Sequence, residues 1–280
     1  MTEKKTKPRI LFLLQFPPPV HGSAIVGKYI HESQLINDSF DCRYINISMS
    51  GSIDESGKMM IGKVFRYVSA IAKQAKEILL HRPDICYLAP MAKGIGFYKD
   101  FIYIVIARIL GVHLVHHFHN KGVKENEHRF IDNLFYRVVF FQSHVILLSK
   151  NIYKDVAKYV TEDKVRYCVN GVPEISITSK KQEYDIVYLL FLSNIIESKG
   201  VFVLLEALSL LNEKKMVFVC HFVGGWGDIS ESLFYTKVKQ LGIEDRVVYD
   251  GMKFGEEKSA AFVDADIFIH PTYNDCFPLV

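Results

Sequence analysis

Short apolar runs rich in β-branched residues recur along the 280-residue sequence, and segments with helical periodicity separate them. Runs of this kind are typical of parallel strands buried between two layers of helices. They predict strands near 9–16, 41–48, 84–90, 113–119, 144–149, 165–170, 185–192, 216–223, 246–250 and 266–270. Helices are predicted near 200–213, 230–241 and 256–264. The sequence therefore predicts an α/β chain with two doubly wound parallel sheets.

The alternation is interrupted once, by the polar stretch "NGVPEISITSKKQEYD". Its turn-forming residues indicate a linker between an N-terminal domain, 1–178, and a second domain, 179–280. Ligands of such sheets bind beyond the carboxyl ends of the strands. The residues that follow each apolar run are therefore the first candidates for a functional site.

Charge is divided unevenly along the chain. Residues 1–180 contain 25 Lys and Arg against 16 Asp and Glu, whereas residues 181–280 contain 9 against 15. The basic first part favours contact with something anionic, such as a membrane surface or a lipid-linked phosphate. Basic residues gather in 58–82, whose apolar positions keep helical spacing at Val64, Val68, Ile71, Ala75 and Ile78. Two interpretations stay open for this helix: peripheral membrane contact, or an ordinary solvated face.

The five cysteines are widely separated and include no C-x-x-C pair, which is typical of buried thiols in a reducing compartment. The start of the chain lacks the pattern of a secretion signal, since the run "RILFLLQF" is short and leads directly into prolines. The longest apolar stretch, 101–112, is too short to span a bilayer and contains Arg108. We therefore expect a cytoplasmic protein.

The stretch "PPPVHGSAIVGKY" follows the first predicted strand and resembles a nucleotide-binding P-loop, with Gly22, Gly27 and Lys28. A P-loop requires Ser or Thr directly after its lysine to hold magnesium, and Tyr29 takes that place. The residues between the glycines favour the first turn of a helix, capped by Ser23. The sequence thus favours a glycine that lets a ligand approach the backbone over an ATP-hydrolysing site that depends on Lys28.

The segment "HHFHN" ends the fourth predicted strand, where alternation puts His117 and His119 on one face. An H-x-H pair can begin a zinc site, but no third ligand is apparent. A histidine that contacts substrate at the strand end fits better. For His116 and His117, hydrogen bonding within a polar crevice remains an alternative.

The second half opens with a strand, a polar loop that contains Ser193, Asn194 and Lys199, and a helix that starts near Gly200. A lysine beside a helix N-terminus suits phosphate, because backbone amides and an ammonium group act together. A later run ends in Gly224 and Gly225, where the backbone can approach a ligand or simply turn.

These loops have a common order: "PPPVHGSA", "HFHN", "VNGV", "FLSNIIESKG", "FVGG" and "HPTYNDCFPLV". Their order and spacing resemble the fourth family of nucleotide-sugar-dependent retaining glycosyltransferases over nearly the whole chain. The resemblance implies the GT-B fold, in which two Rossmann-like domains bind the donor. It also implies that the second domain is incomplete, because the second glutamate of the family's E-x₇-E motif would fall three residues past Val280.

The resemblance also implies roles for individual residues. Lys199 would bind the donor diphosphate, with Asn194 in the place of the family's arginine. Asp275 aligns with the first glutamate of E-x₇-E and would contact donor sugar hydroxyls. The implied catalytic set is His119, Lys199 and Asp275. The implied donor-binding set is Gly22, Ser193, Asn194, Lys199, Gly224, Asp275 and Phe277. The implied acceptor-side set is His21, Gly22, His119 and Asn120.

The implied activity is transfer of a sugar, with retention of anomeric configuration, from a UDP- or GDP-linked donor to a glycan or polyprenyl-linked acceptor. Such a hexosyltransferase would serve cell-surface polysaccharide synthesis at the inner face of the membrane. It would need neither a metal nor a further cofactor and would bind no nucleic acid. A noncatalytic nucleotide-sugar binder is the alternative, because Asn194, Asp275 and the missing segment each remove a feature that the family uses.

Overall fold

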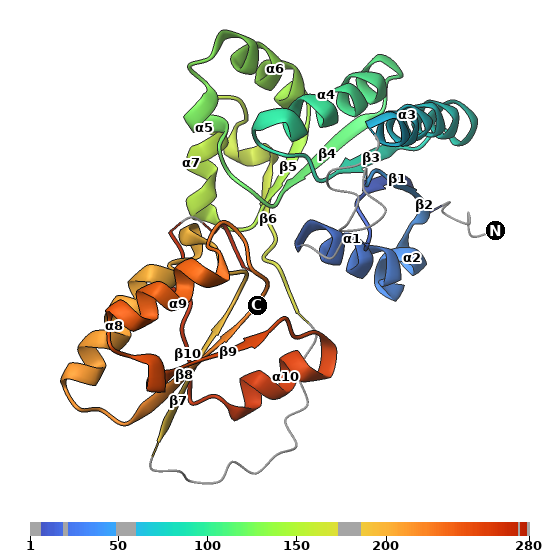
Figure 1. Ribbon diagram of the computed structural model, residues 1–280. Helices are drawn as coiled ribbons and strands as arrows, with labels where there is room; N and C mark the ends of the chain where they lie inside the picture. Colours follow the sequence, from blue (N-terminus) through green and yellow to red (C-terminus); the bar gives the residue numbers. More distant parts are fainter. Residues whose placement is uncertain (1–6, 19–21, 49–59, 173–185, 274, 279–280) are drawn as a thin grey trace. The chain divides into compact units, whose positions relative to one another are not determined.

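The computed structural model describes residues 7–18, 22–48, 60–172, 186–273 and 275–278. The chain forms two compact units, Met1–Gly171 with Cys276–Leu279, and Val172–Asp275 with Val280 (Figure 1). The predicted boundary between residues 178 and 179 lies outside the described residues. Each unit contains one parallel sheet, so the prediction of two doubly wound sheets is confirmed.

The first unit is built on a six-stranded sheet with the order β2-β1-β3-β4-β5-β6, in which all neighbouring strands are parallel. Its strands are β1 (Arg9–Leu14), β2 (Asp41–Asn46), β3 (Ile85–Leu88), β4 (His113–Phe118), β5 (His144–Leu147) and β6 (Val165–Tyr167). Each of the six lies within the range that the apolar runs predicted. The agreement follows from the pattern, because strands buried on both faces are continuous apolar runs.

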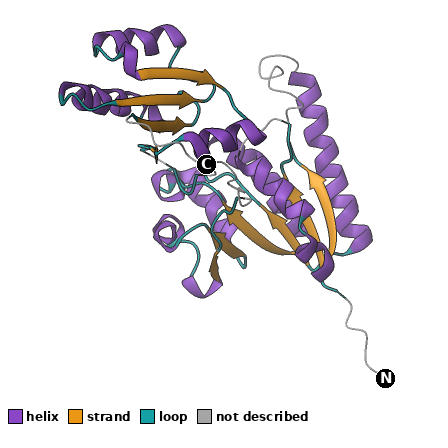
Figure 2. Ribbon diagram, turned by 90° about the horizontal axis from the view of Figure 1, so that it is seen from below, coloured by secondary structure: helices purple, strands orange, loops and turns teal. Residues whose placement is uncertain are grey.

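Helices cover both faces of this sheet, as Figure 2 shows. Alternate residues of β1 point to opposite sides: Leu11 and Leu13 join one core cluster, and Ile10, Phe12 and Leu14 join another. The second cluster packs under α1 (Gly22–Glu32) and α2 (Gln34–Ser39). The first cluster packs under α3 (Met60–His81), α4 (Gly94–Ile109) and α6 (Phe130–Phe140). Short helices α5 (Val123–Asn126) and α7 (Tyr153–Val156) follow β4 and β5.

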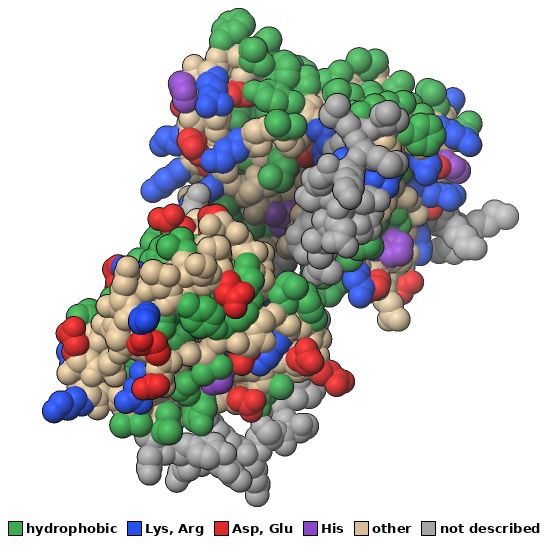
Figure 3. Space-filling model, viewed as in Figure 1, with side chains coloured by type: hydrophobic (Ala, Val, Ile, Leu, Met, Phe, Trp, Pro, Cys, Tyr) green, Lys and Arg blue, Asp and Glu red, His purple; other side chains and the backbone are tan. Residues whose placement is uncertain are grey.

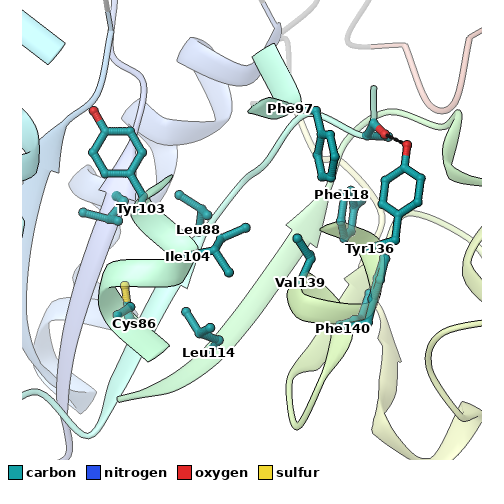
Figure 4. Close-up of a cluster of buried hydrophobic side chains, with 14 of the residues drawn as sticks. Cys86, Leu88, Phe97, Tyr103, Ile104, Leu114, Phe118, Tyr136, Val139 and Phe140 are labelled. Carbon is teal, nitrogen blue, oxygen red and sulfur yellow. Dashed lines mark hydrogen bonds between the residues drawn. The ribbon is translucent and has the colours of Figure 1, made fainter. Parts of the chain in front are cut away.

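The larger core cluster is rich in aromatic side chains from α4 and α6 (Figure 4). Phe97 and Tyr136 lie with ring centroids 4.8 Å apart, and Phe101 stacks on Phe135 at 4.0 Å. The buried Tyr136 hydroxyl donates to the Ala92 backbone oxygen at 2.7 Å. This bond ties α6 to the loop after β3, so the core also positions one of the loops at the carboxyl edge of the sheet.

The predicted apolar face of the 58–82 helix is partly wrong. Helix α3 buries Ala70, Gln74 and Ile78, whereas Val64 and Val68 are 53% and 55% exposed. The cause is Gln74, a polar residue at a core position whose side-chain amide donates to the Tyr103 backbone oxygen of α4 at 2.8 Å. Periodicity counts only apolar residues, so it predicted a buried face that did not include Gln74.

The second unit is built on a four-stranded parallel sheet with the order β10-β7-β8-β9. Its strands are β7 (Val187–Leu192), β8 (Phe218–Val223), β9 (Val247–Gly251) and β10 (Ile267–Phe268). Its helices are α8 (Val201–Glu213), α9 (Glu231–Gln240) and α10 (Gly255–Asp264). All three helices agree with the sequence prediction within one residue at each end. The strand order brings β7 and β10 together, although 74 residues of chain separate the ends of these strands in sequence.

The stretch that resembles a P-loop in sequence forms helix α1. It begins at Gly22, and Ser23 lies in its first turn, where the hydroxyl donates to Gln15 Oε1 at 3.1 Å. Gly27 lies inside the helix, and Lys28 Nζ is 3.9 Å from Glu32 Oε1. The backbone amides of these residues are therefore part of a helix, which favours the helical interpretation over a phosphate-wrapping loop.

Gly27 is required by packing, and this can be tested against a second helical glycine. A Cβ at Gly27 would clash with the Gln15 backbone oxygen, whereas a Cβ at Gly62 of α3 would meet nothing within 4 Å. We expect Gly27→Ala to lower the free energy of unfolding by about 1–3 kcal/mol. The matched change Gly62→Ala should raise it by about 0.5–1 kcal/mol. Urea unfolding measures both, and a neutral Gly27→Ala would contradict the packing of α1 against the loop after β1.

Candidate active site

In the first unit, two histidines lie together where β4 ends. The rings of His117 and His119 have centroids 4.1 Å apart. Tyr87 Oη, from β3, is 2.6 Å from His117 Nδ1, and Asn170 Oδ1, beyond β6, is 3.2 Å from His119 Nδ1. Because the strands are parallel, their carboxyl ends bring Tyr87, His119 and Asn170 to the same edge. The predicted shared face of His117 and His119 is confirmed.

Burial keeps both imidazoles neutral. The pKa of His117 is lowered to about 3, chiefly by burial and also by the neighbouring His119, against a hydrogen bond with the Cys168 backbone. Burial also lowers the pKa of His119, although the bond with Asn170 acts in the opposite direction. His119 Nε2 is buried without a hydrogen-bond partner among the described residues. Because Nδ1 donates its proton to Asn170 Oδ1, Nε2 of the neutral ring can accept a hydrogen bond from a ligand hydroxyl.

The other residues of the predicted acceptor side have different roles. Asn120 Oδ1 accepts a hydrogen bond from the Ala92 amide at 2.6 Å, so its side chain joins the loops after β3 and β4. Gly22 is the exposed first residue of α1. His21 lies outside the described residues. His116 lies on the opposite face of β4, with Nε2 3.0 Å from the Val139 oxygen of α6, and is a core residue.

No zinc site accompanies the histidine pair in the described part of the chain. There, no group of three or more His, Cys, Asp and Glu side chains is placed to hold a metal ion. The residue that the sequence analysis did not single out is Asn170, within the quoted "VNGV". Its position after the sixth apolar run is the signal that could have identified it.

In the second unit, backbone hydrogen bonds join the loops that follow β7 and β8 at the carboxyl edge of the sheet. The Ile195 amide donates to Gly225 O at 2.8 Å, and Gly227 N donates back to Ile195 O at 3.1 Å. A Cβ at Gly224 would clash with the Ser193 backbone oxygen, so the close approach needs glycine there. Tyr249 Oη also donates to Gly224 O at 2.8 Å. Ser193 and Gly224 therefore act through their backbones, and they hold the loops after β7 and β8 together.

Lys199 lies in the loop after β7, at the end of the short helix η4 (Glu197–Lys199). Gly200 follows it with φ 79°, in the left-handed region, and α8 starts at Val201. A Cβ at Gly200 would clash with the Pro271 backbone oxygen of the loop after β10. Glycine is thus needed both for the turn and for the contact. The predicted helix start near Gly200 is confirmed, and it places Lys199 beside the N-terminus of α8.

The side chains of Lys199 and Asp275 meet, as their shared assignment to the donor implied. Lys199 Nζ lies 2.7 and 2.8 Å from the two carboxylate oxygens of Asp275, and His270 Nε2 lies 3.0 Å from Asp275 Oδ2. All three side chains are largely buried. Burial alone would raise the pKa of Asp275, but hydrogen bonds from Lys199 and His270 outweigh it and lower that pKa. The carboxylate is therefore charged.

His270 is the residue that the sequence analysis missed in this cluster, although the quoted motif "HPTYNDCFPLV" begins with it. Asn194 is exposed at the start of the same loop, next to Ser193. Phe277 groups with the first unit, and its backbone oxygen accepts a hydrogen bond from Asn170 Nδ2 at 2.9 Å. The donor roles of Asn194 and Phe277 stay predictions.

The buried histidines of β4 make stability depend on pH. Burial lowers the pKa of His116 from 6.5 to about 4, so the unfolded chain binds a proton at pH 5 and the folded chain does not. Stability is full above pH 6.5 and is lost as the pH falls toward 4. The free energy of unfolding should therefore fall between pH 7 and pH 5. We expect this fall to be about 1–2 kcal/mol smaller in His116→Gln, whose amide can still donate to Val139 O.

Urea unfolding at both pH values measures this difference. His113→Gln, at the exposed start of the same strand, is the matched control. An unchanged pH dependence in His116→Gln would contradict the assignment of His116 as a buried neutral residue.

Comparisons with known proteins match this arrangement. Residues 175–280 match the family model "Glycosyl transferases group 1". Comparison with curated protein sequences finds no match. The family match thus covers the second unit with its Lys199 and Asp275 cluster, and the first unit is compared through its fold.

Three solved structures illustrate the likeness in fold. The lipopolysaccharide outer core galactosyltransferase WaaB in its apo form is 13% identical with a TM-score of 0.65, over 97% of this chain and 76% of that one. Alr3699/HepE from Anabaena, in complex with UDP and glucose, is 14% identical with a TM-score of 0.60, over 95% and 74%. An α,α-trehalose-phosphate synthase (UDP-forming) from Burkholderia xenovorans is 10% identical with a TM-score of 0.61, over 97% and 80%.

These findings confirm the predicted GT-B fold. The family match also confirms the enzyme class, since residues 175–280 match a glycosyltransferase model of the group 1 type.

Proposed function

We propose that the chain transfers a sugar from a nucleotide-sugar donor to a glycan or lipid-linked acceptor, with retention of anomeric configuration. The observation that carries this proposal is the Lys199 ammonium group beside the N-terminus of α8, within a largely buried cluster with Asp275 and His270. A cation and helix amides at one place form a site for a diphosphate. The cluster lies at the carboxyl edge of a parallel sheet, where such folds bind ligands.

The donor diphosphate would take over the ammonium group that Asp275 now holds. Lys199 Nζ contacts both carboxylate oxygens, so an entering phosphate competes with Asp275 for the same charge. Once released, the Asp275 carboxylate is free to accept hydrogen bonds from sugar hydroxyls, while His270 keeps it oriented. The exchange replaces one anion of Lys199 by another, and the Asp275 carboxylate would then be stabilised by hydrogen bonds from His270 and from the sugar hydroxyls.

The reaction needs stabilisation of the leaving group above all. As the bond between the anomeric carbon and the diphosphate oxygen breaks, negative charge grows on that oxygen, beside the Lys199 ammonium. The acceptor oxygen forms its bond to the anomeric carbon on the same face. Its proton passes to the departing diphosphate oxygen. No metal ion is required for this sequence of steps.

We assign the acceptor side to the first unit. His119, whose buried Nε2 has no hydrogen-bond partner among the residues that the structure describes, would accept a hydrogen bond from a sugar hydroxyl there. The excess of Lys and Arg in residues 1–180 favours an acceptor or surface that carries phosphate. A cell-surface polysaccharide precursor at the cytoplasmic face of the membrane meets both conditions. UDP is the first nucleotide to test, because Alr3699/HepE was solved with UDP.

A noncatalytic nucleotide-sugar binder remains a second candidate. It is favoured by Asn194, which brings no second positive charge to the diphosphate, and by the neutralisation of Lys199 by Asp275. Incubation with UDP-sugars and extracted membrane glycolipid separates the two candidates. Release of UDP with a product of unchanged anomeric configuration by NMR supports the enzyme, whereas donor affinity without transfer supports the binder.

Loss of the ammonium group should weaken nucleotide binding. We expect Lys199→Ala to reduce the affinity for UDP by about 1.5–3 kcal/mol, the range for hydrogen bonds to charged groups. Lys214→Ala, at the exposed C-cap of the same helix, removes an equal charge away from the cluster and should leave the affinity unchanged. Calorimetry measures both variants, and equal affinities would remove Lys199 from the site.

Loss of the carboxylate charge should separate nucleotide binding from transfer. In Asp275→Asn, Lys199 no longer has an anionic partner, so UDP should bind as before or more tightly by up to about 1 kcal/mol. Sugar transfer should fall, because the anion that accepts from sugar hydroxyls is absent. A loss of UDP affinity as large as that of Lys199→Ala would show that Asp275 supports the nucleotide directly and would contradict the exchange described above.

A further inference from the structure

Helix α4 carries an apolar stripe on the side that faces away from the core. Ile95, Ile102 and Ile109 are spaced by seven residues and therefore lie along one face of the helix. They are 88%, 43% and 78% exposed. The opposite face already buries Phe97, Ile104 and other core residues. A helix that is apolar on both faces is not expected where one face meets only water.

Helix α6 repeats this arrangement. Phe130, Leu134 and Phe141, the last directly after the helix, project opposite the buried Tyr136 and are 84%, 50% and 59% exposed. On α3, exposed apolar side chains occupy one sector of the helix, and basic side chains occupy the next. The apolar sector contains Val64, Phe65, Val68 and Leu79.

The three helices form one layer. Tyr67 Oη of α3 donates to Lys99 O of α4 at 2.7 Å, and Tyr98 Oη of α4 donates to Asp132 Oδ1 of α6 at 2.6 Å. Figure 3 shows hydrophobic side chains along the upper edge of the first unit, over α6, α4 and α3. We name this surface, with the exposed residues of α3, α4 and α6, the outer helical face. Single exposed apolar residues are common, but a set that spans three adjacent helices marks an interaction surface.

Charge on the outer helical face has one sign. The three helices contain seven basic residues: Lys63, Arg66, Lys73, Lys76, Lys99, Arg108 and Arg137. Lys99 is mostly buried and pairs with Asp100, so the basic surface comes from the other six. Of their three acidic residues, Asp100 and Asp132 are buried, and Glu77 is half buried and pairs with His81. A surface that is both apolar and basic fits an anionic lipid bilayer, whose acyl region takes apolar side chains and whose headgroups take cations.

We propose that the outer helical face docks this chain on an anionic lipid bilayer. A second copy of the chain is a poorer occupant, since a two-fold contact would bring this basic surface against itself. The sequence suggested membrane contact through 58–82 alone, and the structure assigns the inserting side chains chiefly to α4 and α6. In the described part of the chain, no helix has the length and hydropathy to cross a membrane.

The topology of the first unit gives this docking a direction. Helices that join parallel strands run opposite to them, so the N-terminal ends of α3, α4 and α6 lie at the carboxyl edge of the sheet. Ile95 and Phe130 belong to the first turns of α4 and α6, and Val64 follows the first turn of α3. His119 lies at the same edge. Docking through this end would bring the histidine pair close to the headgroups, where a lipid-linked acceptor would be presented.

Vesicle co-sedimentation of the full chain tests the proposal independently of donor binding. Wild-type protein should bind vesicles that contain phosphatidylglycerol more strongly than pure phosphatidylcholine vesicles, and salt should weaken the binding. Ile95→Glu with Phe130→Glu should lower the partition coefficient at least ~10-fold, because two inserting side chains become anionic. Leu35→Glu is the matched control, since Leu35 is 79% exposed on α2, on the opposite side of the same sheet.

A second set of variants tests the contribution of the basic side chains to vesicle binding. Lys73→Glu with Lys76→Glu should reduce binding to the anionic vesicles several-fold, whereas Lys214→Glu with Lys215→Glu, exposed in the second unit, should not. Circular dichroism and UDP affinity confirm that each variant is folded. The proposal is overturned if wild-type protein does not bind anionic vesicles, or if the variants and their controls bind these vesicles equally. It is also overturned if wild-type protein is a dimer that the Ile95 and Phe130 changes dissociate.

Discussion

The pairing of Lys199 with Asp275 depends on the topology of the second sheet. The two residues are 76 positions apart in sequence, yet Nζ lies within 2.8 Å of both carboxylate oxygens. Strands β7 and β10 are neighbours in the sheet, so the loops that follow them meet at one edge. Gly200 makes this approach close, because any side chain at this position would clash with Pro271. This ion pair links the loops after β7 and β10, at the place that we propose for the donor diphosphate.

The first unit provides a different chemical surface at its corresponding edge. Its histidines are kept neutral by burial, and Tyr87 and Asn170 fix the ring orientations from neighbouring strands. Neutral imidazoles recognise hydroxyl groups without attracting a phosphate. An ion-paired lysine in the second unit and a neutral polar site in the first thus suit the two partners of the proposed sugar transfer. The fold alone does not establish that function, since one fold supports many activities.

The outer helical face adds a constraint that the sheet edges do not explain. Surface helices of this length usually have one polar face, but α4 and α6 present Ile, Leu and Phe on both sides. The acidic residues of these two helices are buried, so their outer surface is basic as well as apolar. Both properties are understood if the helices lie against anionic lipid.

The sequence by itself determined the ten strands, the helix start after Lys199 and the loops that hold the polar residues. Strand and helix periods, and glycine at a turn, are local properties, so they can be read from consecutive residues. Only the tertiary structure decided that Gln74 faces the core, because its partner is the backbone of another helix. It also decided that His270 and Asn170 join the site residues, and that Lys199 is already paired. Those contacts depend on which strands are neighbours in each sheet, and no short stretch of sequence encodes this order.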